Sequence, residues 1–278
     1  MAYFPLEIPV LPHMRDHAFD GRVMFSAAEL LHLLAAAVKD LFPGLSGAQA
    51  ETLFPRFLLL PPETGGFVSV LMDVEAHAEG DVSVKLLNKF QSPSGLSRLR
   101  EHVRVRFLKE KPMDFSFPTF GEALELSGNF VEIPAEKIYE ELVPFGPAYR
   151  NIRGNLLLNA QAALARIQAG TQLVTGRFPG VPLVSDAAFH AACVWGQRYH
   201  GKVVFPVGFK RRCFQAETKP EIPYLCRVMP AGTDRETLIF DLWIYDLKGM
   251  PCEAIAGLRM ADVTDGRIQP PLWVREES

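Results

Sequence analysis

The chain has 278 residues, of which 48% are hydrophobic and 22% are charged, so it holds enough apolar side chains for one large domain or two small ones. A formal net charge of −3 argues against general attraction to nucleic acid or to an anionic membrane. No apolar run approaches the roughly 20 residues that cross a bilayer, and residues 1–12 lack a signal-peptide pattern, so we expect a cytoplasmic protein without a membrane partner.

The first part of the chain is predicted to contain one helix followed by four strands. The helix begins at Ser26, where Ser26 and Glu29 match the capping-box pattern, and it ends before Pro43-Gly44. It is apolar over much of its circumference, as in a helix that a sheet wraps around. Short β-like runs then predict strands at residues 57–60, 66–75, 81–88 and 100–107.

A segment with several prolines and glycines follows at residues 111–134 and is predicted to be a linker. Residues 136–142 look helical, whereas residues 155–169 fit either a strand or a short helix. We therefore expect an N-terminal unit over residues 1–120, and a linker with a C-terminal unit over residues 121–278.

The second part of the chain repeats the order of the first. A helix is predicted from Ser185 to Tyr199, ended by His200-Gly201, and strands are predicted at residues 203–209, 224–229, 237–245 and 251–263. Residues 246–249 between the last two strands have the composition of a hairpin turn. Each half thus combines a helix with an antiparallel sheet that can curl around it, which is an α+β arrangement.

His17 is the first candidate for a chemical role. It lies shortly before the helix that begins at Ser26, near main-chain N–H groups that favour negative charge. A neutral imidazole can remove the proton next to a thioester carbonyl, and Gly21 allows the backbone to approach the carbonyl oxygen closely. A histidine beside a turn is also commonly structural, so this motif alone leaves both interpretations open.

Two further motifs occur in the second half. Asp186 and His190 are four residues apart on a predicted helix, so both can face one cavity, although an aspartate in a first turn also commonly serves only the helix dipole. The segment Phe145-Gly146-Pro147 indicates a rigid turn. The four cysteines are scattered without CxxC spacing or a histidine cluster, so neither a metal site nor a disulfide framework is predicted.

Together, the motifs resemble the ordered signature of polyketide synthase dehydratase domains. That family has a Leu-Pro pair, H-x-x-x-G-x-x-x-x-P, Y-G-P and D-x-x-x-Q or D-x-x-x-H; this chain has Leu11-Pro12, His17-x-x-x-Gly21, Phe145-Gly146-Pro147 and Asp186-x-x-x-His190. The resemblance spans nearly the whole chain and implies a double hotdog, two fused units that each wrap an antiparallel sheet around a central helix. Ser26 stands where the family has proline, and Phe145 stands where it usually has tyrosine, which removes a hydroxyl from the site.

The resemblance implies a dehydratase that eliminates water from a β-hydroxyacyl thioester and gives an enoyl thioester, in polyketide or fatty-acid-like biosynthesis. His17 would remove the α-proton, Asp186 would protonate the departing β-hydroxyl, and His190 would orient Asp186. For that role, burial must raise the pKa of Asp186 against the helix dipole. Gly21 would give backbone access to the thioester carbonyl, and Gly146-Pro147 would shape the wall near His17. No metal or redox cofactor is implied.

The implied partner is an acyl carrier protein that presents the acyl chain on a phosphopantetheine arm, and the resemblance also allows a homodimer. Two basic clusters suit such a partner, and both also suit a solvated strand face. They are Arg98, Arg100, His102, Arg104 and Arg106, which alternate along one strand, and Lys210-Arg211-Arg212.

Two alternatives remain open. One is another reaction on the same pair, either double-bond isomerisation or a product-template-like cyclisation; a deep chamber favours cyclisation and a narrow tunnel favours elimination. The other is a non-catalytic module that binds an acyl chain or a carrier, which is favoured if His17 and Asp186 do not face one pocket. A hotdog thioesterase is disfavoured because no further acidic residue stands out in these motifs.

Overall fold

An antiparallel sheet and two long helices make up most of the computed structural model, which describes residues 2–62, 66–91, 95–112, 116–171 and 180–275. The helices are α1 (Ala27–Leu41), α2 (Phe120–Leu124), α3 (Ala135–Lys137), α4 (Pro182–His200) and α5 (Leu272–Arg275). The strands are β1 (Ala2–Pro9), β2 (Ala18–Phe19), β3 (Arg22–Val23), β4 (Gln49–Leu53), β5 (Phe67–Ala76), β6 (Val82–Gln91), β7 (Ser97–Phe107), β8 (Val131–Pro134), β9 (Ile152–Asn159), β10 (Ala162–Ile167), β11 (Phe205–Phe214), β12 (Tyr224–Asp234), β13 (Thr237–Asp246) and β14 (Pro251–Ala261).

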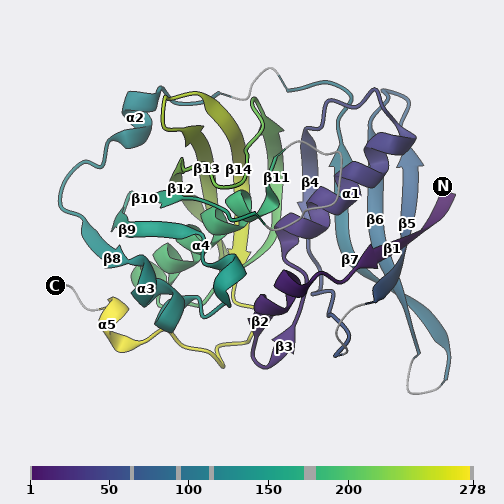
Figure 1. Ribbon diagram of the computed structural model, residues 1–278, viewed down its shortest axis with the longest axis horizontal. Helices are drawn as coiled ribbons and strands as arrows, with labels where there is room; N and C mark the ends of the chain where they lie inside the picture. The colour runs from purple at the N-terminus through teal and green to yellow at the C-terminus, as the bar shows by residue number, and fades with distance from the viewer. Residues whose placement is uncertain (1, 63–65, 92–94, 113–115, 172–179, 276–278) are drawn as a thin grey trace.

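Within the described residues, twelve of these strands form one sheet in the order β1-β5-β6-β7-β4-β11-β14-β13-β12-β10-β9-β8. In Figure 1, α1 lies across the strands at the N-terminal end of this order, and α4 lies across the strands at the other end. Strand β4 pairs with β7 on one side and with β11 on the other. The sheet therefore runs continuously from the strands around α1 to the strands around α4.

Local sequence explains where the two long helices begin and end. The Ser26 hydroxyl caps α1 by accepting a hydrogen bond from the Glu29 N–H at 3.2 Å. Helix α4 begins three residues earlier than predicted because Pro182, whose fixed backbone angle suits a first turn, starts it. It ends at Gly201, which adopts the left-handed backbone angle φ of +62° that glycine tolerates.

Most predicted strands are present, and the 246–249 turn joins β13 to β14. The predicted strand at residues 57–60 is wrong: Leu59 makes only an isolated bridge to Met24, and the strand of this region is β4. Residues 155–169, which the sequence left undecided, contain the second part of β9 and all of β10. The predicted linker 111–134, of which 113–115 lie outside the described residues, contains α2 and β8, and β8 pairs with β9.

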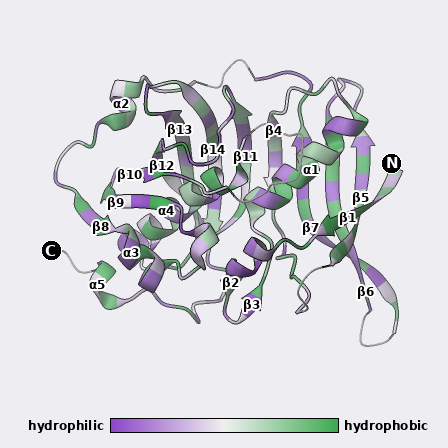
Figure 2. Cartoon of the chain, in the orientation of Figure 1, coloured by the Kyte–Doolittle hydropathy of each residue, from purple (hydrophilic) through white to green (hydrophobic). Residues whose placement is uncertain are grey.

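The alternation of inward and outward residues holds over much of the sheet. Figure 2 shows strands banded in green and purple, as expected when one face of a sheet covers an apolar core. Strand β7 breaks this pattern at a register shift, where Leu86 pairs with Val103 and Leu87 pairs with Glu101. His102 is the extra residue of this bulge, and it is buried, not outward-facing as predicted.

Among the described residues, no helix has both the length and the apolar character that a membrane span requires.

Candidate active site

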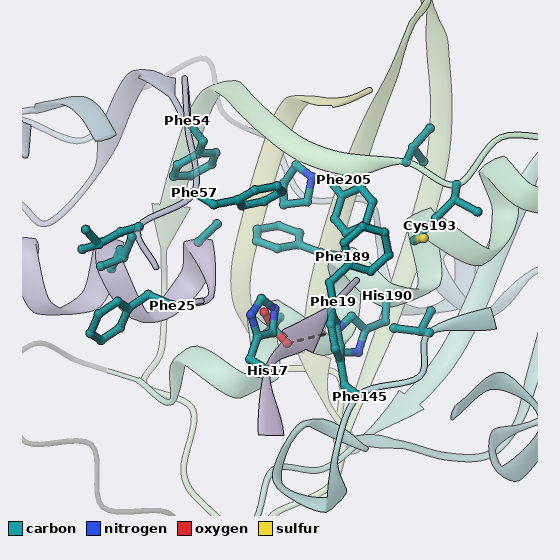
Figure 3. Close-up of a pocket in the computed structure, with 18 of the residues that line it drawn as sticks. His17, Phe19, Phe25, Phe54, Phe57, Phe145, Phe189, His190, Cys193 and Phe205 are labelled. Carbon is teal, nitrogen blue, oxygen red and sulfur yellow. Dashed lines mark ion pairs between the residues drawn. The ribbon is translucent and has the colours of Figure 1, made fainter. Parts of the chain in front are cut away.

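Side chains from α1, α4 and the segments before, between and after them line one pocket (Figure 3). Most of the lining is apolar, with phenylalanines from both halves of the chain, among them Phe25 and Phe189. His17, Asp186 and His190 are among its polar side chains. The structure therefore brings the histidine of the first half to the same pocket as the aspartate and the histidine of the second.

His17 is held by the backbone in one tautomer. It follows a 3-10 helix at Pro12–Asp16, and its Nδ1 lies 2.9 Å from the carbonyl oxygen of Met24. A carbonyl only accepts, so Nδ1 carries the proton and Nε2 keeps a free lone pair. Burial lowers the pKa of His17, and Asp186 opposes this only in part, so the ring stays neutral near pH 7.

The motif around Gly146 supports the loop that carries His17. The Gly146 N–H donates to the Asp16 carbonyl oxygen and the Ala148 N–H donates to the Asp16 carboxylate, both at 2.8 Å. A Cβ atom on Gly146 would lie 2.5 Å from the Asp16 side chain, which explains the need for glycine. The Phe145 ring lies between the two histidines, 4.3 Å from the His17 ring and 5.3 Å from the His190 ring, centroid to centroid.

Asp186 and His190 form a buried pair on α4. Asp186 Oδ2 lies 3.0 Å from His190 Nε2, the ion pair dashed in Figure 3, yet neither atom has an aligned hydrogen-bond partner among the described residues. Because α4 begins at Pro182, Asp186 lies in the second turn, not the first. This position removes the interpretation of Asp186 as a simple helix-dipole charge.

The pKa of Asp186 runs against one expectation. Burial does raise it, as the acid role requires, but the electrostatic and hydrogen-bond interactions with His190, the interaction with His17 and a hydrogen bond from Ser26 together outweigh burial. The pKa of Asp186 is therefore lowered in the protein without substrate, where the carboxylate is the favoured form.

Gly21 is not brought to the pocket. It is exposed in the turn between β2 and β3, where its φ of +70° accounts for the glycine, and it is not among the pocket-lining residues. The start of α1 does reach the pocket, because Ala27 in its first turn lines the cavity.

No sequence motif indicates the second buried carboxylate near His17, which is that of Glu29. Although the Glu29 N–H completes half of the predicted capping box, the Glu29 side chain turns away from it, to His13 at 2.7 Å and to the Tyr149 hydroxyl. The Tyr149 ring lies 4.9 Å from the His17 ring. No local pattern marks this contact, because Tyr149 and Glu29 are far apart in the chain.

Both predicted basic clusters have members that are paired with acidic side chains or buried. Arg104 pairs with Glu101, and Arg106 pairs with Asp81. His102 faces inward and lines the pocket, a site residue that the alternating pattern concealed. Arg212 is buried and pairs with Glu253 at 2.8 Å, so it is not part of a surface cluster.

A protein-family model described as the polyketide synthase dehydratase N-terminal domain matches residues 132–270, half of the chain. No curated protein sequence matches.

Solved structures extend the likeness over nearly the whole chain. The dehydratase domain from the CurJ module of the curacin polyketide synthase has a TM-score of 0.74 at 16% identity, covering 94% of this chain and 92% of that chain. The dehydratase domain of PpsC from Mycobacterium tuberculosis, in complex with C12:1-CoA, gives 0.70 at 17%, over 93% and 92%. A trans-AT polyketide synthase dehydratase domain from Brevibacillus brevis gives 0.75 at 15%, over 94% of both chains.

At these identities the solved structures show only the fold, and they confirm the predicted double hotdog. With the family model, which rests on the sequence, they lead to one conclusion: the chain belongs to the polyketide synthase dehydratase family.

Proposed function

We propose that this protein is a hydro-lyase that eliminates water from a β-hydroxyacyl thioester and releases the enoyl thioester, in polyketide or fatty-acid-like biosynthesis. The observation that carries the proposal is the meeting of His17 and Asp186, one from each half of the chain, at a single apolar pocket. An apolar lining suits an acyl chain, and the two polar groups suit its reacting end.

In the first part of the reaction, His17 acts as the base. Its Nε2 accepts the α-proton, and the electrons of that C–H bond move toward the thioester carbonyl. The free N–H groups at the start of α1, beside Ala27, are the donors that stabilise the negative charge on the carbonyl oxygen.

In the second part, Asp186 acts as the acid. The C–O bond to the β-hydroxyl breaks as the double bond forms, and the Asp186 carboxyl donates its proton to the departing oxygen, which leaves as water. Support comes from Asp186 Oδ2, whose unused hydrogen-bonding capacity suits a substrate hydroxyl. Transfer of a proton from His17 to Asp186 then restores the starting state.

A carrier-bound substrate is favoured by a groove beside the pocket. Arg22, Arg56 and Arg100 line it, all three are exposed, and no described acidic residue lines it with them. The groove shares Arg56 and Phe57 with the pocket. We infer that the acyl chain enters here from an acyl carrier protein and that the arginines bind the phosphate of its pantetheine arm.

We also propose that the N-terminal and C-terminal units meet near residue 120. The division near residue 120 is supported by the sheet order, because β1 and β4–β7 lie at one end and β8–β14 at the other.

The test is turnover of a β-hydroxyacyl N-acetylcysteamine thioester, followed as loss of water by mass spectrometry. We expect His17→Ala and Asp186→Asn each to lower kcat by about 100-fold or more, the contribution typical of a general acid or base. His77→Ala and Asp40→Asn, which change residues outside the pocket lining, serve as matched controls that keep the parent rate. Unchanged turnover in both site variants, or no turnover by the parent over a range of chain lengths, would contradict the proposal.

A further inference from the structure

The hydroxyl of Tyr139 reaches the buried pair from an element that none of the motifs includes. Tyr139 lies in a π-helix at Ile138–Leu142, directly after α3, and its side chain is buried. Its hydroxyl oxygen is 3.3 Å from His190 Nδ1, and the two rings meet edge to face with centroids 5.8 Å apart.

The direction of this hydrogen bond follows from the other partners of the hydroxyl. The N–H groups of Asn151 and Ile152 both donate to the Tyr139 oxygen at 2.9 Å. A hydroxyl oxygen has two lone pairs, and both are thereby used. The only remaining role of the group is to donate its own proton, and His190 Nδ1 is the acceptor within reach.

A proton on His190 Nδ1 would find no acceptor in the Tyr139 hydroxyl. An imidazolium would place an N–H at Nδ1 against an oxygen that has no lone pair left for it. The neutral ring with its proton on Nε2 satisfies Tyr139, and it leaves the Nε2–H on the side of Asp186, whose Oδ2 is 3.0 Å away.

We propose that Tyr139 is a positioning residue for the dehydration, because its hydroxyl holds His190 as a neutral imidazole with its proton on Nε2, facing Asp186. The consequence for catalysis rests on the function proposed above. A neutral His190 orients the Asp186 carboxyl without fixing it as a carboxylate, whereas an imidazolium would form a full ion pair with it and keep the proton off. Asp186 can then carry the proton that the leaving hydroxyl needs.

Other titratable groups face the pair, and Tyr139 is distinct among them in touching His190 Nδ1. His17 faces both members from the loop before β2, and Tyr149 approaches Asp186 from the 3-10 helix at Pro147–Tyr149. Arg153 on β9 acts on Tyr139, and Glu29 on α1 acts on His17.

The first test determines directly which ring nitrogen of His190 carries the proton. In protein labelled with ¹⁵N-histidine, two-bond ¹⁵N–¹H spectra identify the protonated ring nitrogen, and His190 is assigned as the signal missing from His190→Gln. We expect Nε2 protonated and Nδ1 unprotonated at neutral pH in the parent, and partial protonation of Nδ1 in Tyr139→Phe. Tyr245→Phe is the matched control, because its hydroxyl donates to the Pro118 carbonyl oxygen instead, and it should leave the His190 signals unchanged.

The second test measures how loss of the Tyr139 hydroxyl changes kcat. In Tyr139→Phe, His190 competes with Asp186 for one shared proton, so Asp186 holds it in a smaller fraction of the molecules wherever the pair carries one proton. On the plateau of the pH profile, kcat should therefore fall by about 10- to 100-fold, within the range of general acid catalysis, with KM little changed. Tyr245→Phe should keep the parent profile.

A proton on His190 Nδ1 in the parent would overturn the inference, and so would a Tyr139→Phe variant with the parent tautomer and the parent pH profile. If Tyr139→Phe does not fold, the parent spectrum alone decides. A parent with the expected tautomer but without turnover would refute the proposed function and leave the hydrogen-bond assignment standing.

Discussion

At the scale of single residues, a backbone contact fits His17 for the proposed role of base. The bond from Nδ1 to the Met24 carbonyl oxygen decides which nitrogen is free, and burial decides that the ring is neutral. His190 is fixed in the opposite sense, with its free nitrogen turned toward the Tyr139 hydroxyl. Two histidines of one pocket therefore present different faces, one suited to take a proton and one suited to orient a carboxyl.

The neutral state of His17 leads to a prediction on pH. Its pKa is lowered from the ordinary value of 6.5, so the base stays unprotonated at a pH where a free histidine would be half charged. We expect the acidic limb of the kcat/KM profile to lie below pH 6.5, measured with the N-acetylcysteamine thioester. An acidic limb at or above 6.5 would show that the base is not a buried imidazole.

The sequence identifies several residues of the site, but it does not predict which other residues they contact. Motif order identifies His17, Asp186 and His190, which the structure places at one pocket. Tyr139, with a partner on a distant helix, has no local signal of its own, and His102 is hidden because a bulge reverses the face of the strand that carries it.

At the scale of elements, the turn at Gly146 positions the His17 loop. Gly146→Ala places a methyl group against the Asp16 side chain, so the loop or the turn must move. We expect a loss of about 1 to 3 kcal/mol in the free energy of unfolding, typical of overpacking, together with a lower kcat. Urea denaturation and turnover measure the two effects. Gly44→Ala is the control, because open space surrounds that position; equal behaviour of the two variants would argue against this role for the turn.

Helix α4 is anchored by a buried ion pair one residue from Asp186. The Ser185 hydroxyl donates to the Glu253 carboxylate at 2.7 Å and accepts from Arg212 at 2.8 Å, and Arg212 also pairs with Glu253. These contacts join α4 to β11 and β14. They explain why Arg212, which belongs to a basic cluster in the sequence, is buried inside the fold.

Removal of one partner from this ion pair should be costly. Arg212→Ala leaves Glu253 buried without its cation, and we expect a loss of about 3 to 5 kcal/mol in the free energy of unfolding, measured by urea denaturation. The double variant Arg212→Met with Glu253→Leu removes both charges and should lose less than the single variant. A single variant whose free energy of unfolding lies within 1 kcal/mol of the parent value, about the contribution of one hydrogen bond, would contradict the assignment.

Elements with strong local signals were predicted well, and those defined by long-range pairing were not. The start of α1 has a capping serine, and the β13–β14 hairpin has its turn residues. Strand β4, Gln49–Leu53, is polar and short, and it is a strand because β7 and β11 pair with it on both sides. Such a strand depends on tertiary context more than on propensity.

At the scale of the whole molecule, the proposed function divides the recognition of one long ligand between the pocket and the arginine groove. The apolar pocket suits the acyl chain, and the groove lined by Arg22, Arg56 and Arg100 suits a negative group outside it. The continuous sheet holds the two together, because β4 links the strands around α1 to those around α4.

This division predicts which substrates respond to loss of the arginines. Arg22→Ala and Arg100→Ala should each raise KM by about threefold for a phosphopantetheine-linked β-hydroxyacyl substrate, since an exposed charge pair contributes up to about 1 kcal/mol. The N-acetylcysteamine thioester, which lacks the phosphate, should keep its KM. Equal effects on both substrates would mean that the groove does not bind the phosphate.

The central claim is that one imidazole and one carboxyl from different halves of the chain act on the same acyl chain. Its most direct test is a crystal structure of Asp186→Asn with a bound β-hydroxyacyl thioester. The claim predicts the α-carbon at about 3 to 3.5 Å from His17 Nε2, a reactive separation, with the β-oxygen hydrogen-bonded to residue 186 in the same molecule. An acyl chain that lies outside this pocket, or that reaches only one of the two groups, would contradict it.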